Sequence, residues 1–125
     1  MNKRRGVWMS YFKVIDDSCT WNKIINKFNT IDSYYSYEYG KLFSAIENGQ
    51  LLGAFFENHI TKVFYPFIKR EIPSYNKGLF DIVTPYGYGG PFVEGDPKQI
   101  DTFYTLFSEY CETENIITET IRFHP

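Results

Sequence analysis

The sequence predicts an α/β fold with a mixed, largely antiparallel sheet flanked by helices. Three segments carry apolar residues at helical spacing, and four others are rich in the β-branched and aromatic residues that favour strands. Along the chain they follow the order helix, helix, three strands, helix, strand, with a glycine-rich loop after the third strand. At 125 residues, without an internal repeat or linker, the chain is expected to form one domain over residues 1–125.

Two amphipathic helices are expected in the first third of the chain. Asp17 or Ser18 can cap the first helix, and its apolar residues recur at i, i+3, i+4 and i+7: Trp21, Ile24, Ile25 and Phe28. Ser36 can cap the second helix, and Asn48 with Gly49 ends it. The apolar stripe of this second helix comprises Tyr39, Leu42, Phe43 and Ile46. Residues 1–10 are expected to form a flexible tail.

Residues 51–57 and 60–72 predict a β-hairpin with a polar turn at Asn58 and His59. Both faces of the second strand are apolar, which requires a cover on each: Val63, Tyr65 and Phe67 alternate with Phe64 and Ile68. Pro66 interrupts this strand and predicts a bulge or an edge.

Residues 79–84 predict a third strand, which leads into a loop over residues 85–91. Asp96 followed by Pro97 marks the start of a helix that should run to about Glu114. The apolar stripe of this helix comprises Ile100, Phe103, Phe107 and Tyr110. Residues 117–124 alternate as a last strand: Thr118, Thr120, Arg122 and His124 share one face, and Glu119, Ile121 and Phe123 the other.

This last strand has no predicted neighbour on its outer side. Because an unpaired strand edge usually needs a neighbour or a cover, we expect one of two arrangements. Either the fold continues in a segment beyond Pro125, or a partner chain such as a second copy pairs there.

Composition excludes several classes of partner. The formal net charge is -2, so the chain has no overall attraction for DNA or an anionic membrane. No apolar stretch reaches the ~18 residues that span a bilayer, which predicts a cytoplasmic protein without a transmembrane segment. Cys19 and Cys111 lack the spacing of a zinc site, so both are expected to be reduced, buried thiols.

The loop over residues 85–91 is the most unusual feature of the sequence. Gly87, Gly89 and Gly90 let the backbone approach a ligand closely, and Tyr86 and Tyr88 offer hydroxyls and flat faces to a sugar or peptide. The loop matches neither a Walker A motif nor a dinucleotide-binding fingerprint. The alternative is a tight, proline-bounded turn with both tyrosines packed on the core.

Basic side chains supply further candidates. Arg122 and His124 lie two residues apart on a strand, where they could bind a phosphate or carboxylate, or carry a proton near a cleft. The alternative is a surface pair on an edge strand. Lys69 and Arg70 lie on opposite faces of their strand, so at most one of them can face a given cleft. No nucleophile motif is present, which argues against a triad hydrolase.

Four segments together resemble the Fem-like branch of the GNAT superfamily of N-acyltransferases. They are YYSYEYGKLF (34–43), VFYPFIKREI (63–72), DIVTPYGYGGP (81–91) and TIRFHP (120–125). The resemblance covers most of the chain from about Trp21 onward, and the glycine loop and the last four residues are its most specific parts. That branch includes bacterial peptidyltransferases that add amino acids to the side chain of the peptidoglycan precursor, and N-acyltransferases that act on cell-surface sugars.

The resemblance implies a GNAT-like N-terminal half in which an acceptor amine attacks an activated acyl carbonyl. The donor would be an aminoacyl-tRNA or an acyl-CoA, and backbone N–H groups would stabilise the oxyanion. The first part of such chains binds the acceptor, here a peptidoglycan precursor or a sugar. The substrate-binding residues implied are Tyr86, Gly87, Tyr88, Gly89, Gly90, Arg122 and His124, with Lys69 as a further candidate.

The resemblance assigns no catalytic, cofactor or metal-binding residue to this chain. Family members are longer, and the acyl-donor part of their fold lies beyond the segment that matches Pro125. The glycine loop also leads into Pro91 and a strand-like segment, and so lacks the helix start that binds pyrophosphate in CoA-dependent members.

Three hypotheses of function follow. The leading one is the acceptor-binding part of an acyltransferase, which does not catalyse the reaction alone. The alternative is a standalone binding or assembly module that pairs through an exposed sheet edge. The third is a complete small acetyltransferase, for which acetyl-CoA should raise the melting temperature.

Overall fold

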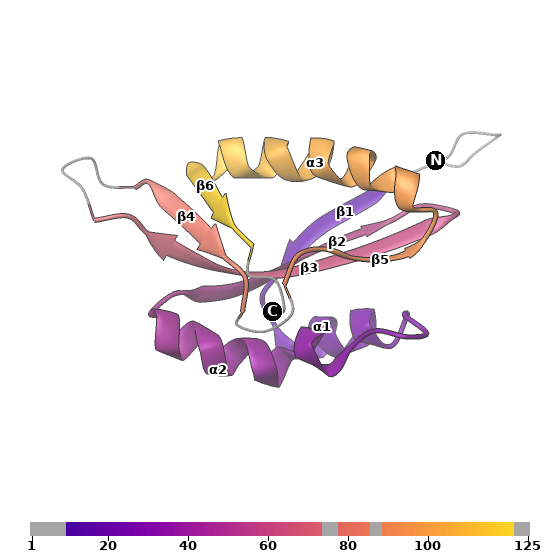
Figure 1. Ribbon diagram of the computed structural model, residues 1–125, viewed down its shortest axis with the longest axis horizontal. Helices are drawn as coiled ribbons and strands as arrows, with labels where there is room; N and C mark the ends of the chain where they lie inside the picture. The colour runs from indigo at the N-terminus through magenta and orange to yellow at the C-terminus, as the bar shows by residue number, and fades with distance from the viewer. Residues whose placement is uncertain (1–9, 74–77, 86–88, 122–125) are drawn as a thin grey trace.

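The computed structural model describes residues 10–73, 78–85 and 89–121. Within these residues it contains six strands, three α-helices and two short 3-10 turns (Figure 1). In chain order they are β1 (Tyr11–Ile15), α1 (Ser18–Ile25), η1 (Ser33–Tyr35), α2 (Tyr37–Glu47), β2 (Gln50–Glu57), β3 (Thr61–Glu71), β4 (Phe80–Val83), β5 (Phe92–Gly95), η2 (Pro97–Gln99), α3 (Ile100–Thr113) and β6 (Ile116–Thr120).

The strands form one mixed sheet in the order β1-β2-β3-β4-β6, and β5 pairs with β3 as well. All pairings are antiparallel except that of β4 with β6, which is parallel. Helix α3 covers one face of the sheet, and α1 and α2 cover the other (Figure 1). The predicted α/β class, with a largely antiparallel sheet flanked by helices, is confirmed.

Each face of the sheet has its own apolar core. Towards α3, the core is centred on Val63, Tyr65, Phe67, Phe103 and Phe107. Towards α1 and α2, it is centred on Trp21, Ile24, Phe55, Phe64 and Ile68. Burying each of these large side chains contributes about 1.5–3 kcal/mol. The prediction that both faces of the second hairpin strand are covered is therefore correct.

Side-chain caps fix the starts of the helices. The Asp17 carboxylate accepts from Thr20 N–H at 2.8 Å at the start of α1, and Ser36 Oγ accepts from Tyr39 N–H at 3.2 Å at the start of α2. Asn48 ends α2 with a left-handed backbone, φ 56°. Asp96 caps the turn η2, so the predicted third helix begins with a 3-10 turn before α3. These caps agree with the sequence prediction.

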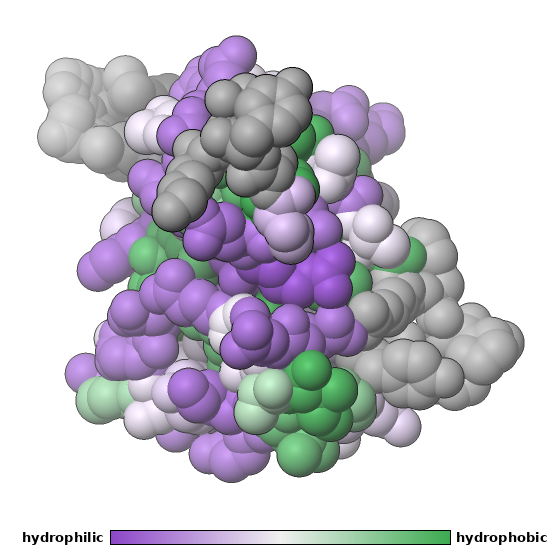
Figure 2. Space-filling view, turned by 90° about the vertical axis from the view of Figure 1, so that its left-hand side faces the viewer, coloured by the Kyte–Doolittle hydropathy of each residue, from purple (hydrophilic) through white to green (hydrophobic). Residues whose placement is uncertain are grey.

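Helix α2 is turned differently from the prediction. Its buried residues are Gly40 and Ser44, whereas Leu42 and Ile46 of the predicted apolar stripe are 57% and 66% exposed. Figure 2 shows an apolar patch over this part of the surface. A Cβ added at Gly40 would lie 2.7 Å from Leu51 Cδ1. The helix therefore lies close to the sheet on its small residues. Of the predicted stripe, Phe43 packs against the core and Tyr39 is half-buried, so the prediction is correct only in part.

Strand β1 was not predicted, and β5 was expected only as a strand-like segment after Pro91, without a pairing partner. Each is short, with five and four residues, and each pairs with a strand that is distant in sequence. Strand β1 pairs with β2 across the whole of α1 and α2, and β5 pairs with the start of β3. Such strands depend on long-range pairing more than on local pattern.

Strand β3 is central, and its register with β2 is continuous through Pro66, so of the two predicted alternatives, a bulge or an edge, the bulge is wrong for this pairing. On the other side, β3 pairs with β5 up to Phe64 and with β4 from Ile68 onward. Ile72 N–H donates to Leu79 and the Ile60 carbonyl accepts from Asp96 N–H, so even-numbered backbone groups of β3 point to this side. Pro66, which lacks an N–H, therefore faces the interval between β5 and β4 and leaves no pairing unmade.

The burial of the two cysteines differs from the prediction. Both cysteines are free, but Cys19 is exposed and Cys111 is half-buried, so the prediction of two buried thiols is wrong. Cys19 is exposed because α1 turns Trp21 and Ile24 towards the sheet and this position outward.

Among the described residues, no helix is long and apolar enough to cross a membrane.

Candidate functional site

The sheet brings together the described residues that lead into the two predicted site segments, at Thr84 and Thr120. Strands β4 and β6 are adjacent and parallel, so their carboxyl ends lie at the same end of the sheet. Val83 pairs with Thr120, and Thr84 N–H donates to the Thr120 carbonyl at 3.2 Å. The glycine loop begins directly after Thr84, and the last predicted motif begins at Thr120.

Gly90 shows how the described end of the glycine loop is held. Its φ is +91°, a conformation that L side chains rarely adopt, and a Cβ there would lie 3.4 Å from Ile121 Cγ2. Its carbonyl accepts a hydrogen bond from the Tyr35 hydroxyl at 3.1 Å. Burial raises the pKa of Tyr35 to about 12, with a further contribution from Asp32, so this hydroxyl remains a donor at neutral pH. The described end of the loop, at Gly90, is thus held between Ile121 and the 3-10 turn before α2.

Five of the predicted site residues lie outside the described residues. They are Tyr86, Gly87, Tyr88, Arg122 and His124. Gly89, half-buried, and Gly90, buried, are described. The assignment of all seven to substrate binding stays a prediction.

Lys69 lies apart from the described part of the loop. Its ammonium group is 3.1 Å from Glu114 Oε1 and 4.3 Å from the centre of the Phe80 ring, on the α3 side of the sheet. Arg70, by contrast, pairs with Glu47 of α2 and with Asp81, at 2.8 Å each. The prediction that Lys69 and Arg70 occupy opposite faces is confirmed.

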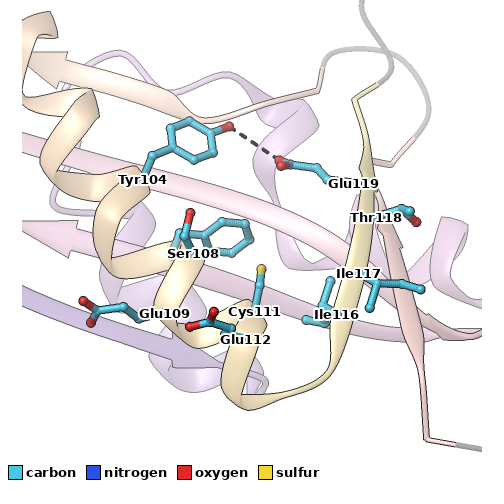
Figure 3. A pocket seen from close by; sticks show the side chains of 10 residues that line it. Tyr104, Ser108, Glu109, Cys111, Glu112, Ile116, Ile117, Thr118 and Glu119 are labelled. Atoms are coloured by element: carbon cyan, nitrogen blue, oxygen red, sulfur yellow. Dashed lines mark hydrogen bonds between the residues drawn. The ribbon is translucent and has the colours of Figure 1, made fainter.

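We call the point where Thr84 and Thr120 pair, at the ends of β4 and β6, the junction. Beside it, a groove with a volume of about 470 Å³ lies between α3 and β6 (Figure 3). It is lined by Tyr104, Phe107, Ser108, Glu109, Cys111, Glu112, Ile116, Ile117, Thr118 and Glu119. Three carboxylates and no lysine or arginine stand in this lining, so the groove favours a cationic group.

Glu119 is the centre of a hydrogen-bonded cluster in this groove. Its Oε2 accepts a short hydrogen bond from the Tyr65 hydroxyl and lies 3.5 Å from the Tyr104 hydroxyl. Burial first, and then hydrogen bonding and the negative charge of Glu119, raise the pKa of both tyrosines, so both remain neutral donors. The cluster holds the carboxylate at the wall of the groove, and Figure 3 shows it pointing towards the Tyr104 hydroxyl.

Cys111 faces the same groove from α3 (Figure 3). Burial raises the pKa of this thiol to about 11, and the charge of Glu119 adds to the effect while Lys69 opposes it. The thiol is therefore protonated at neutral pH and a poor nucleophile.

Sequence reasoning did not find the cluster around Glu119. Tyr65 and Glu119 are 54 residues apart, and only the parallel pairing of β4 with β6 places them on one face. The one available signal was the alternation that puts Glu119 and Ile121 on the same face of the last strand. Both do lie on the α3 side, since Ile121 packs on that core. Among the described residues, no group of three or more His, Cys, Asp or Glu could hold a metal ion.

Comparison with protein-family models, with curated proteins and with solved structures found no match for this chain. The functional argument therefore rests on the geometry of the junction and the groove.

Proposed function

We propose that this chain is the acceptor-binding, N-terminal part of a Fem-like aminoacyl or acyl transferase. The acceptor would be the amine of a cell-wall precursor or of a cell-surface sugar. One observation carries the proposal: the residues that lead into the glycine loop lie beside the end of β6, at the carboxyl ends of two adjacent parallel strands. In open sheets of parallel strands, ligands bind outside the carboxyl ends of the strands, and β4 and β6 are the parallel pair among the described strands of this sheet.

The chemistry of acyl transfer to an amine fits this arrangement. The reaction needs two substrates held in line and hydrogen-bond donors at the developing oxyanion, and it needs no protein nucleophile. A backbone with several glycines can come close to both reacting groups. Glu119 lies on the strand that leads to the junction, and its carboxylate can hold the ammonium form of an acceptor amine before transfer.

The acyl donor is an aminoacyl-tRNA or an acyl-CoA in this proposal. Both are cytoplasmic compounds, so we place the reaction in the cytoplasm. We assign the donor site to a part of the transferase other than the residues described for this chain. The chain alone is then expected to bind the acceptor without turning it over.

The proposal is tested by acceptor binding. We expect a soluble UDP-linked muramyl pentapeptide, or a glucosamine disaccharide, to bind the chain in calorimetry. The double change Tyr86→Ala and Tyr88→Ala should weaken that binding at least about tenfold, because tyrosines that stack on a ligand often dominate its affinity.

The control is Tyr11→Ala, which removes an exposed tyrosine from β1, at the other edge of the sheet. It should leave the affinity unchanged. Full affinity in the double variant, with its circular dichroism spectrum intact, would exclude the glycine loop as the binding site.

The exposure of β6 at the edge of the sheet favours a second function. Within the described residues β6 is the last strand of the sheet order, its residues 117–120 are exposed, and Ile117 is 58% exposed. An exposed edge strand with an apolar side chain can pair with another chain. The alternative is therefore an assembly module in which β6 pairs with a second copy or with the rest of a transferase.

A further inference from the structure

A second groove lies at the opposite edge of the sheet from β6, between β1 and α1. Its volume is about 360 Å³. The floor is apolar and consists of Ile15, Ile24 and Phe55, all of which are buried. Tyr11 lies at one end, 52% exposed, with its ring edge-on to that of Phe55 at 6.0 Å between centroids. The groove therefore offers apolar contacts along its length.

Lysines line the rim of this groove. Lys13 comes from β1, Lys23 from α1, and Lys27 from the turn that follows α1. Glu57 is the one acid in the lining, and it pairs with Lys27 at 3.8 Å. In the described part of the chain, no carboxylate lies within 4.0 Å of the ammonium groups of Lys13 or Lys23. The groove is thus positive in a chain whose formal net charge is -2.

Strand β1 also offers backbone groups for pairing. Among the residues described, it pairs with β2 alone, so its other side is an open strand edge. Tyr11, Lys13 and Ile15 alternate with Phe12 and Val14, which pack towards α3, so these three side chains face the groove.

An added strand would place its own alternate side chains opposite these three. Cross-strand neighbours interact best when apolar faces apolar and opposite charges face each other. The complement of Tyr11, Lys13 and Ile15 is therefore apolar, acidic and apolar at alternate positions. This order reads the same in both directions, so it holds for a parallel or an antiparallel peptide. Lys23 and Lys27, above the groove, favour the same central acid.

We propose that β1 and α1 bind an extended peptide segment of a partner protein, which adds to β1 as a further strand and carries an acidic residue between two apolar ones. Main-chain hydrogen bonds to β1 supply affinity, and the lysines select the acid. This interaction goes beyond acceptor binding and uses the opposite edge of the sheet from the glycine loop.

The first test uses the peptide acetyl-Leu-Thr-Glu-Thr-Leu-amide, titrated into the isotope-labelled full chain and followed by NMR. We expect amide shifts in β1 and α1, and affinity at least about tenfold weaker when lysine replaces the central glutamate. Two further peptides carry N-methyl groups, one on the glutamate and one on both threonines. Because alternate residues of an added strand pair with the edge, one of these two should lose binding and the other keep it. Undiminished binding of both would overturn strand addition.

The second test reverses the charge of one lysine of the protein. Lys23→Glu should weaken binding of the glutamate peptide about tenfold and strengthen binding of the lysine peptide. Lys98→Glu makes the same charge change at an exposed lysine on η2 and should alter neither. Equal affinities of the two variants for the glutamate peptide would overturn the proposal.

Discussion

Tyr35 connects the layers of the molecule at the point where the glycine loop is held. Its hydroxyl donates to the Gly90 carbonyl at 3.1 Å, and its own carbonyl accepts from Trp21 Nε1 at 2.9 Å. Its ring packs on Phe92 at 5.5 Å between centroids. One buried residue thus links α1, the 3-10 turn and the end of the loop.

Removing this hydroxyl should destabilise the fold. Tyr35→Phe leaves the buried Gly90 carbonyl without this donor, so we expect the free energy of unfolding to fall by about 1–2 kcal/mol in urea titrations. Tyr11→Phe removes the hydroxyl of an exposed tyrosine and should change it by less than about 0.5 kcal/mol. Equal effects of the two changes would mean that the bond to Gly90 contributes no stability.

At the scale of elements, local signals found the helices and the hairpin. Capping residues at Asp17, Ser36 and Asp96 and alternation in β2 and β3 act over a few residues, and the structure agrees with them. Strand β1 and the pairing of the strand-like segment at β5 were missed because both pairings are long-range. The rotation of α2 was missed because Gly40 and Ser44 carry the contact.

The candidate site was predicted only in part for the same reason. The glycine loop and the last strand stand out by composition, but their meeting depends on the parallel pairing of β4 with β6. The tyrosines around Glu119 come from β3 and α3, and neither carries a local sign of that contact. Residue pattern therefore finds site segments, and the sheet order decides which of them meet.

The exposed edge of β6 gives a prediction about this element. If β6 pairs with a second copy, sedimentation velocity should show a dimer whose fraction rises with protein concentration. Ile117→Lys places a charge on the edge and should give a monomer, because lysine on an edge strand opposes pairing. Ile60→Lys, at a position 42% exposed in the hairpin turn, is the matched control and should leave the dimer intact. A monomer at every concentration in the unmodified chain would exclude self-assembly through β6.

For the whole molecule, the aromatic core has an electrostatic consequence. Burial raises the pKa of Tyr35 and Tyr110 from 10.0 to about 12, and that of Cys111 from 9.0 to about 11. The pKa values of Tyr65 and Tyr104 are raised as well. All five groups are neutral when protonated, and the fold disfavours their ionised forms. Their effects on stability therefore have the same sign.

The chain should consequently unfold in alkali. A group whose pKa is higher in the folded state contributes stability that is complete below its unfolded pKa and lost as pH rises through the folded value. Stability should thus be constant up to about pH 9 and decline between about pH 9 and pH 12. Circular dichroism and tyrosinate absorbance should change together, since the buried tyrosines ionise when the core opens. Cys111→Ala removes one of these groups, so the decline should start at a higher pH. Smooth titration of all tyrosines near pH 10, with an unchanged dichroism spectrum, would mean that solvent reaches the core without unfolding.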